Sequence, residues 1–181
     1  MARRRARGSA TLRPIAKELL EAAAVKGPPV PVAAIAASLG ATVRYAPFKG
    51  ELAGMLIRDD AERGTVIGVN SLHHSNRQRF TIAHECGHLR LHKGQQSYVD
   101  RSFRINRRDE VSSQATDAEE IEANRFAAEL LMPYAMITED LRTRRPDIED
   151  EDELRELADR YGVSLQALTL RIRSVVPSTR W

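Results

Sequence analysis

Apolar and polar positions repeat with two different periods in the first part of the chain, and the change of period separates helices from strands. A spacing of three or four residues predicts helices over 14–26 and 31–40. Short apolar runs between turn residues predict strands over 41–48, 52–60 and 64–70. The turn sequence AERG joins the last two runs, so we expect these two strands to form a β-hairpin.

A third helix is expected over residues 75–92, SNRQRFTIAHECGHLRLH. Ser75 and Gln78 are spaced as in a capping box, which predicts where this helix begins, and the glycine after Lys93 suits its end. Pro14 is expected in the first turn of the first helix, where the missing amide hydrogen of proline costs little.

The rest of the chain is predicted to be helical after a long polar loop over 94–117, which is functional or disordered. Good helix formers fill 118–133, and two or three further helices follow. The pattern predicts an α+β chain with a small, mainly antiparallel sheet of about three strands packed on helices. We divide it into a core over 14–140 and a C-terminal helical region over 141–181.

Length and composition exclude several classes of protein. A chain of 181 residues can form one domain with a hydrophobic core. No apolar run approaches the roughly 18 residues that span a bilayer, and no apolar stretch of a secretory signal follows the basic N-terminus. Cys86 is the only cysteine, which excludes an internal disulfide. We therefore expect a cytoplasmic protein that does not associate with a membrane.

Charge is distributed unevenly around a net value of +3. Acidic residues crowd 147–153, and arginines crowd the N-terminus: Arg3, Arg4, Arg5, Arg7 and Arg13. We expect residues 1–13 to be a basic, disordered, solvated tail. A non-specific anchor for nucleic acid or an acidic partner is the alternative, but no aromatic side chain that could stack on bases lies between these arginines.

The sequence HECGH from His84 to His88 has the H-E-x-x-H spacing of a zinc site. Residues at i and i+4 share a helix face, so both histidines can bind one ion. Glu85 then lies beside the ion, where its carboxylate can take a proton from a zinc-bound water and later give it to a leaving amine. The alternative is a chance match, because the motif consists of common residues.

Three further histidines are not expected to be ligands. His92 lies eight residues after His84, which is about 12 Å along a continuous helix and too far for the same ion. His73 and His74 precede the helix, and we interpret them as surface residues; the alternative is that one of them lines the cleft.

A catalytic zinc ion needs a third protein ligand, and we expect it on the helix over 118–133. Glu120 shares a helix face with Asn124, so Glu120 could bind the ion while Asn124 orients a histidine. Glu122 is rotated by about 200° from Glu120 and is predicted to be solvated. Without the upstream motif, Glu120 would be interpreted as an ordinary surface residue.

At this point the chain resembles the ImmA/IrrE family of metallopeptidases. The likeness is carried by RQRFTIAHECGHLRLH followed by EIEANRFAAELLMP, and it extends over roughly residues 14–173. It implies a zincin-type fold with one zinc ion per chain, held by His84, His88 and Glu120, and with Glu85 as general base. It also implies that the substrate is a helix-turn-helix transcriptional repressor.

Cys86 departs from the family, which often has leucine at this position. We interpret it as a small buried hydrophobic residue. The alternative is a thiol that regulates the site by oxidation.

Substrate recognition by a zincin usually adds an extended peptide to a sheet edge. The expected edge is the strand LAGMLI, and its residues Gly54, Met55 and Leu56 are the substrate-strand candidates; the alternative is that this strand is central. The polar loop, which also holds Phe103, could cover the cleft and supply a group that stabilises the oxyanion; the candidates for that group are Tyr98, Arg101, Arg104, Arg107 and Arg108. A solvated loop is the alternative for each of them.

The C-terminal sequence LADRYGVSLQALTLRI has a helix-turn-helix pattern. Ala158, Gly162, Val163 and Leu168 fall where the turn and its packing need them. Leu170 on the outward face and the acidic run before the motif disfavour DNA binding. We expect these helices to pack on the core or to dock a partner.

These features together predict an intracellular zinc-dependent endopeptidase that cleaves a protein substrate, with a helix-turn-helix repressor as the expected partner. The alternative is a non-proteolytic regulatory or toxin–antitoxin binding protein with a structural or vestigial zinc site. A third hypothesis, a DNA-binding protein that uses the arginine tail and the C-terminal helices, is disfavoured by the charge pattern.

Overall fold

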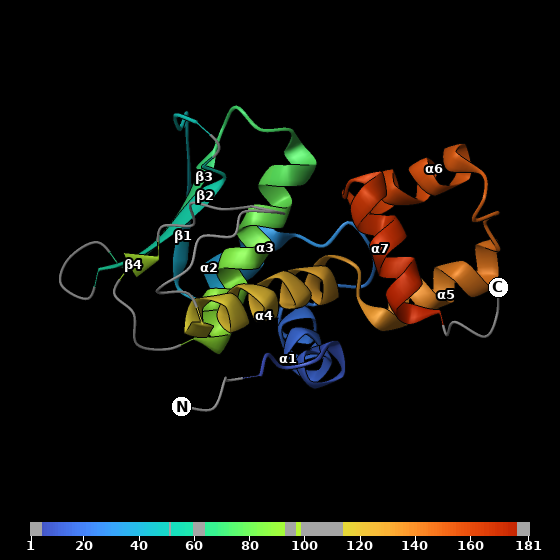
Figure 1. The fold of residues 1–181 in the computed structure, drawn as a ribbon, viewed down its shortest axis with the longest axis horizontal. Helices are drawn as coiled ribbons and strands as arrows, with labels where there is room; N and C mark the ends of the chain where they lie inside the picture. The colour runs from blue at the N-terminus through green and yellow to red at the C-terminus, as the bar shows by residue number, and fades with distance from the viewer. Residues whose placement is uncertain (1–4, 51, 60–63, 93–96, 99–113, 177–181) are drawn as a thin grey trace.

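The computed structural model describes residues 5–50, 52–59, 64–92, 97–98 and 114–176 and shows an α+β fold (Figure 1). In chain order the elements are α1 (Ser9–Ala22), α2 (Val32–Ser38), β1 (Ala41–Ala46), β2 (Gly54–Asp59), β3 (Gly64–Asn70), α3 (Ser75–Leu91), β4 (Ser97–Tyr98), α4 (Gln114–Leu131), α5 (Tyr134–Arg144), α6 (Glu151–Tyr161) and α7 (Leu165–Val175). None of the helices described here is long and apolar enough to cross a membrane.

The strands form one mixed sheet in the order β1-β3-β2-β4. β2 and β3 pair antiparallel from Asp59 opposite Gly64, so the predicted hairpin is confirmed. β1 pairs with β3 in parallel, and β4 pairs antiparallel with β2. The predicted three strands before the motif are therefore confirmed, and the short β4 is added from a segment for which the sequence predicted a loop.

Strand β2 is only partly an edge strand. β4 pairs with Leu56 and Ile57, and the Leu56 side chain is fully buried, so the edge prediction is wrong for Leu56. Among the residues that the structure describes, no strand pairs with Gly54 or Met55 on the side of β2 that faces away from β3. The part of β2 that remains open to an added strand is thus its first two residues.

The first helix begins earlier than the sequence predicts. α1 starts at Ser9, so Pro14 lies inside the helix rather than in its first turn. Leu12 is fully buried, and the Arg13 guanidinium lies 3.6 Å from the centre of the Tyr134 ring. The assignment of residues up to 13 to a disordered tail is therefore wrong from Arg7 onward, because Arg7 pairs with buried Glu122 and α1 packs on α4.

The start of α3 is capped by a different residue from the one predicted. His74 is the N-cap, and its Nδ1 accepts a hydrogen bond from the Asn76 backbone N–H at 3.2 Å. Gln78 donates instead to the carbonyl oxygens of Ser71 and His73. The helix position is as expected, but the capping-box prediction for Ser75 and Gln78 is wrong.

Helix α3 lies at the centre of the molecule (Figure 1). The sheet lies beside it and α4 crosses it, while α1 packs against α4 below it in this view. Every residue from Thr81 to His88 is buried, because β2, β3, α2 and α4 surround this part of the helix. The H-E-x-x-H sequence therefore lies in the core of the fold.

The C-terminal helices are tied to this core by buried polar contacts. Arg171 of α7 makes a two-pronged ion pair with Glu129 of α4 and also donates to the Met132 carbonyl oxygen. Asn76 of α3 donates to the Val163 carbonyl oxygen in the turn between α6 and α7. α5 runs across the boundary proposed at 140/141 and packs on α7, so this boundary falls inside a helix rather than in a linker.

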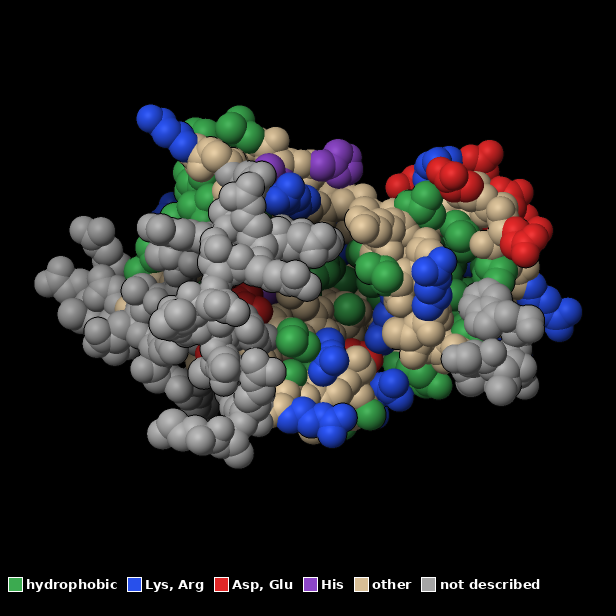
Figure 2. Space-filling model, viewed as in Figure 1, with side chains coloured by type: hydrophobic (Ala, Val, Ile, Leu, Met, Phe, Trp, Pro, Cys, Tyr) green, Lys and Arg blue, Asp and Glu red, His purple; other side chains and the backbone are tan. Residues whose placement is uncertain are grey.

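The turn between α6 and α7 has the geometry that the sequence pattern requires. Gly162 has a left-handed φ of +61°, and Ala158, Val163 and Leu168 are buried around it. Acidic side chains gather over α6 (Figure 2), while Leu170 on α7 is 58% exposed. An acidic and partly apolar surface of this kind is poorly suited to DNA.

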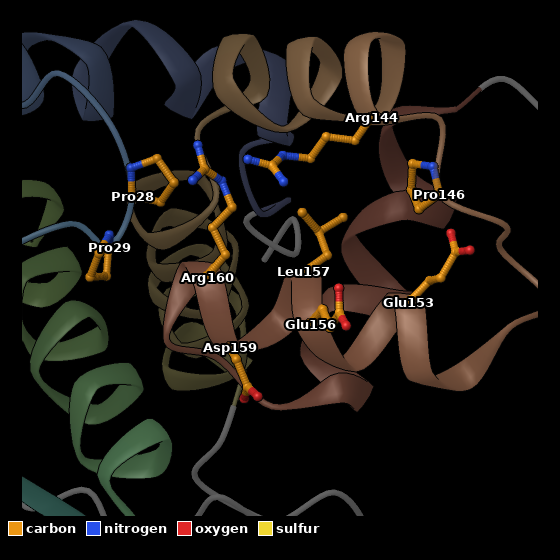
Figure 3. A pocket seen from close by; sticks show the side chains of 9 residues that line it. All are labelled: Pro28, Pro29, Arg144, Pro146, Glu153, Glu156, Leu157, Asp159 and Arg160. Carbon is orange, nitrogen blue, oxygen red and sulfur yellow. The ribbon is translucent and has the colours of Figure 1, made fainter.

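A groove of about 850 Å³ lies between the α1–α2 loop and helices α5 and α6 (Figure 3). It is lined by Pro28, Pro29, Arg144, Pro146, Glu153, Glu156, Leu157, Asp159 and Arg160. None of these residues belongs to the predicted zinc site, so the groove is separate from it.

Candidate metal centre

Helix α3 directs the two motif histidines toward one point. His84 and His88 are each 1% exposed, and their Nε2 atoms lie 2.9 Å apart. This convergence follows from their i and i+4 spacing on one helix face.

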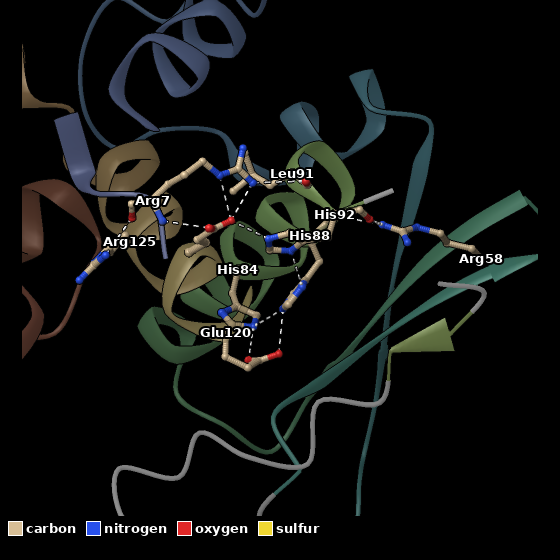
Figure 4. Close-up of polar contacts among 9 residues, drawn as sticks. Arg7, Arg58, His84, His88, Leu91, His92, Glu120 and Arg125 are labelled. Carbon is tan, nitrogen blue, oxygen red and sulfur yellow. Dashed lines mark hydrogen bonds and ion pairs between the residues drawn. The ribbon is translucent and has the colours of Figure 1, made fainter. Parts of the chain in front are cut away.

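Helix α4 brings Glu120 to the same point (Figure 4). One carboxylate oxygen lies 3.2 Å from His84 Nε2, and the other lies 3.2 Å from His88 Nε2. The ligand atoms of the three residues all lie within 4.8 Å of one another. Glu120 is partly exposed, so the cluster is buried on the helix side and open on the other.

Asn124 fixes which nitrogen of His84 is free. Its Oδ1 lies 3.0 Å from His84 Nδ1, and an amide oxygen can only accept, so the proton belongs on Nδ1. His84 Nε2 then carries a free lone pair, and this lone pair faces the cluster. Orienting a ligating histidine in this way is the role that the sequence predicts for Asn124.

The donor set fits a small divalent metal ion. In a tetrahedral zinc site with bonds of about 2.0–2.1 Å, ligand atoms are roughly 3.3 Å apart. The separations of 2.9, 3.2 and 3.2 Å are close to that value. Two nitrogens and a carboxylate are also the ligand types that zinc takes in catalytic sites.

The charge of the cluster favours a cation. Burial alone would raise the pKa of Glu120, but the hydrogen bonds and charge of His84 and His88, when these imidazoles carry a proton on Nε2 in place of a metal ion, outweigh it and hold the pKa at about 2. Glu120 is therefore ionised near neutral pH, which is the state in which a carboxylate binds a metal.

Glu85 follows His84 in α3 and is fully buried. A Cβ built on Gly54 would lie 3.6 Å from Glu85 Oε1, so the start of β2 passes directly next to this carboxylate. The Glu85 carboxylate, one residue along α3 from His84, is therefore next to the start of the predicted substrate strand.

The comparisons with known proteins agree with this geometry. A family model, the IrrE N-terminal-like domain of peptidase family M78, matches residues 36–173. The chain belongs to this family. The ImmA/IrrE resemblance and the zincin-like α+β fold expected from it are therefore confirmed.

A Mycobacterium tuberculosis transcriptional regulator is similar in structure, with a TM-score of 0.61 and 17% sequence identity. The match covers 94% of this chain and 48% of the regulator, so the chain spans about half the length of that protein. At this identity the likeness shows the fold alone. The search of curated proteins found no match to the chain.

Two residues near the cluster, Glu122 and His92, make contacts that the sequence did not predict. Glu122 was predicted to be solvated, and this is wrong: it is fully buried and contacts Arg7 and His92. A second face of α4 is covered by α1 and the segment before it, which a helical wheel does not show. His92 is outside the ligand cluster, as expected, but its Nδ1 lies 3.1 Å from His88 Nδ1.

The remaining predicted residues lie away from the cluster or outside the described part of the chain. His73 is half-buried and His74 is the exposed cap of α3. Cys86 is buried, and burial together with the charge of Glu85 raises the pKa of its thiol to about 12, which favours the hydrophobic interpretation. Tyr98 lies in β4, and the oxyanion candidates Arg101, Arg104, Arg107 and Arg108, together with Phe103 of the same loop, lie outside the described residues.

Gly87 sets the distance between the two helices that carry the cluster. A Cβ at this position would lie 3.1 Å from Ala123 Cα and 3.3 Å from the Ala123 carbonyl oxygen, so part of the α4 backbone would have to move. We expect Gly87→Ala to lower the free energy of unfolding by about 1 kcal/mol, because overpacking outweighs the gain in helix propensity. We also expect weaker zinc binding, because α4 carries Glu120.

Chemical denaturation and zinc titration would check the Gly87→Ala prediction. Gly27→Ala is the control, because nothing lies within 4 Å of a Cβ built there. Equal zinc affinity and undiminished stability in Gly87→Ala would contradict the prediction.

Proposed function

We propose that the protein is an intracellular zinc-dependent endopeptidase that cleaves a protein substrate. The observation that carries the proposal is the convergence of His84 Nε2, His88 Nε2 and the Glu120 carboxylate beside buried Glu85. Membership of a metallopeptidase family supports it.

His84, His88 and Glu120 are the residues that would hold the ion. Zinc bound there would polarise a peptide carbonyl and make a water molecule acidic. Glu85 would accept the proton of that water and pass it to the leaving amine. Asn124 would keep His84 in the tautomer that leaves Nε2 free, through the 3.0 Å contact to Nδ1.

The substrate would bind as an extended segment along the start of β2. Gly54 and Met55 support this placement, because their backbone edge is unpaired among the described residues and the Glu85 carboxylate is adjacent. Leu56 is removed from the set of exposed substrate contacts, because β4 pairs with it.

A helix-turn-helix repressor is the substrate class that we propose. The family resemblance supports it, and so does the structural similarity to a transcriptional regulator. We do not expect direct DNA binding, because acidic residues occupy the first turn of α6 beside the helix-turn-helix geometry.

The proposal is tested by elemental analysis of purified protein. We expect about one zinc per chain, the stoichiometry of a single catalytic site. The variants His84→Ala and Glu120→Ala are expected to lose most of the metal. His74→Ala and Glu139→Ala, which replace the same residue types outside the cluster, are expected to keep it.

Absence of zinc from the wild type after zinc has been added back would overturn the proposal. It would favour a non-proteolytic binding protein with a vestigial site. Zinc that persists unchanged in both His84→Ala and Glu120→Ala would show that the ion binds elsewhere.

A further inference from the structure

We propose that His92 and Glu122 are positioning residues of the metal centre, and that Arg7 anchors them from the segment before α1. This inference rests on the proposed zinc site. The three residues form a polar chain, Arg7–Glu122–His92, that ends on His88 (Figure 4); we name it the buried polar chain because Glu122 and His92 are buried, while Arg7 at its outer end is half-buried.

The contact between the two histidines begins the chain. His88 Nδ1 lies 3.1 Å from His92 Nδ1, and His92 Nε2 lies 3.0 Å from Glu122 Oε2. His92 is 5% exposed and Glu122 is fully buried, so water competes little for either contact. His88 is thus held through the ring nitrogen that faces away from the ligand cluster.

One arrangement of protons satisfies every contact in the chain. If His88 offers the Nε2 lone pair to a metal, its proton is on Nδ1 and is donated to His92 Nδ1. His92 then carries its own proton on Nε2 and donates it to the Glu122 carboxylate, which can only accept while ionised. The reverse arrangement would protonate His88 Nε2 and block metal binding, so Glu122 selects the binding tautomer.

Arg7 makes the burial of Glu122 possible. Its Nε and Nη2 donate to Glu122 Oε2 at 2.9 and 2.6 Å, and its backbone N–H donates to Oε1 at 2.9 Å. Arg125 Nη1 donates a hydrogen bond of 2.8 Å to the Arg7 carbonyl oxygen. A buried carboxylate without such partners would be costly, so the segment before α1 becomes part of the support of the site.

Arg58 of β2 binds the C-terminal end of α3, where His88 and His92 lie. Its Nη2 donates to the carbonyl oxygens of His88 and His92 at 2.9 and 2.8 Å. A cation at a helix C-terminus is favourable, and this one holds the backbone of both histidines. The two histidines are therefore fixed through both their side chains and their carbonyls.

The two ligating histidines are supported differently. His84 donates to the neutral amide of Asn124, whereas His88 is linked through His92 to a carboxylate. A carboxylate behind a ligating imidazole increases its basicity. Loss of the buried polar chain should therefore weaken metal binding through His88 while the His84 contact to Asn124 stays intact.

The experiment compares zinc affinity across variants of the full chain by competition with a chromophoric chelator. His92→Phe removes the acceptor for His88, and Arg7→Ala removes the anchor of Glu122 while it leaves both histidines in place. We expect each to bind zinc about 10- to 100-fold more weakly than the wild type. Glu122→Gln should lose less than His92→Phe, because the amide oxygen can still accept from His92.

Glu129→Gln is the matched control. It weakens the buried ion pair between Glu129 of α4 and Arg171 of α7, which is separate from the contacts of the histidines. We expect it to lower stability without a change in zinc affinity. The visible absorption of the cobalt-substituted protein gives a second readout, because it depends on how the ligands surround the metal. It should change in His92→Phe, which removes the contact that holds the ligand His88, and not in Glu129→Gln.

The outcomes separate this inference from the proposed function. Wild-type zinc affinity in a folded His92→Phe variant, alongside loss of zinc in His84→Ala, would overturn the buried polar chain and leave the zinc site standing. If His92→Phe does not fold, Arg7→Ala decides, and wild-type affinity there overturns the inference. A wild type that binds no zinc would overturn both proposals.

Discussion

Glu85→Gln is expected to reduce peptide cleavage by about 10²- to 10⁴-fold, the usual contribution of a general base, while the protein keeps its zinc. The amide has nearly the shape of the carboxylate but cannot take a proton from water. The metal should stay, because the ligand cluster consists of His84, His88 and Glu120 alone among the described residues. The substitution therefore separates proton transfer from metal binding.

The measurement is a cleavage assay on a helix-turn-helix repressor, together with the zinc content of the same preparation. Glu139→Gln is the control, because Glu139 lies on α5 in an exposed pair with Arg142. Cleavage close to the wild-type rate in Glu85→Gln would show that another group acts as the base. Loss of zinc together with activity would instead assign Glu85 to the support of the site.

Arg171→Met is expected to lower the free energy of unfolding by about 3–5 kcal/mol, the usual result of breaking a buried ion pair on one side. The Arg171 side chain is 3% exposed and that of Glu129 is 1% exposed. Two parallel hydrogen bonds of 2.9 and 2.7 Å join them, and a third reaches the Met132 carbonyl oxygen. The substitution would leave the Glu129 charge buried, with the Arg13 Nε 3.8 Å away as its remaining ion-pair partner among the described residues.

Urea denaturation followed by circular dichroism would give this difference. Arg173→Met is the control, because Arg173 is an exposed arginine on the same helix and should cost little. A loss below about 1 kcal/mol in Arg171→Met would mean that the pair is no more important than a surface salt bridge. The C-terminal helices would then be held mainly by their apolar contacts.

Local periodicity was sufficient to predict much of the fold and the centre of the site. The hairpin of β2 and β3 and the helical position of the motif follow from spacing and turn residues close together in the chain. The pairing of Glu120 with Asn124 on one face also follows from helix geometry, and the structure brings both to the histidines. The hairpin and the shared helix face depend on spacing that is local in the chain, which is why the sequence could predict them.

Contacts between distant segments could not be predicted in this way. Arg7 and Glu122 are 115 positions apart, and nothing near either residue in the chain indicates the other. Glu122 looked solvated because a wheel assumes one buried face, whereas α4 is covered by α3 on one side and by α1 on another. His74 displaced Ser75 as the cap of α3 because an imidazole nitrogen can also accept from a helix N–H.

The glycines around α3 bear on which metal ions the protein can accept. Gly54 lets β2 lie close to α3 on one side, because a Cβ there would lie 2.3 Å from the Thr81 side-chain Cγ2 and, toward β3, 2.9 Å from the Gly68 carbonyl oxygen. Gly87 brings the backbone of α4 close to α3 on another side, because a Cβ there would lie 3.1 Å from Ala123 Cα. Because the α4 backbone yields less readily than a side-chain end, the distance between α4, which carries Glu120, and the two imidazoles of α3 should change little. An ion with a larger radius than zinc would have to displace whole elements, and the site should therefore discriminate between divalent ions by size as well as by ligand chemistry.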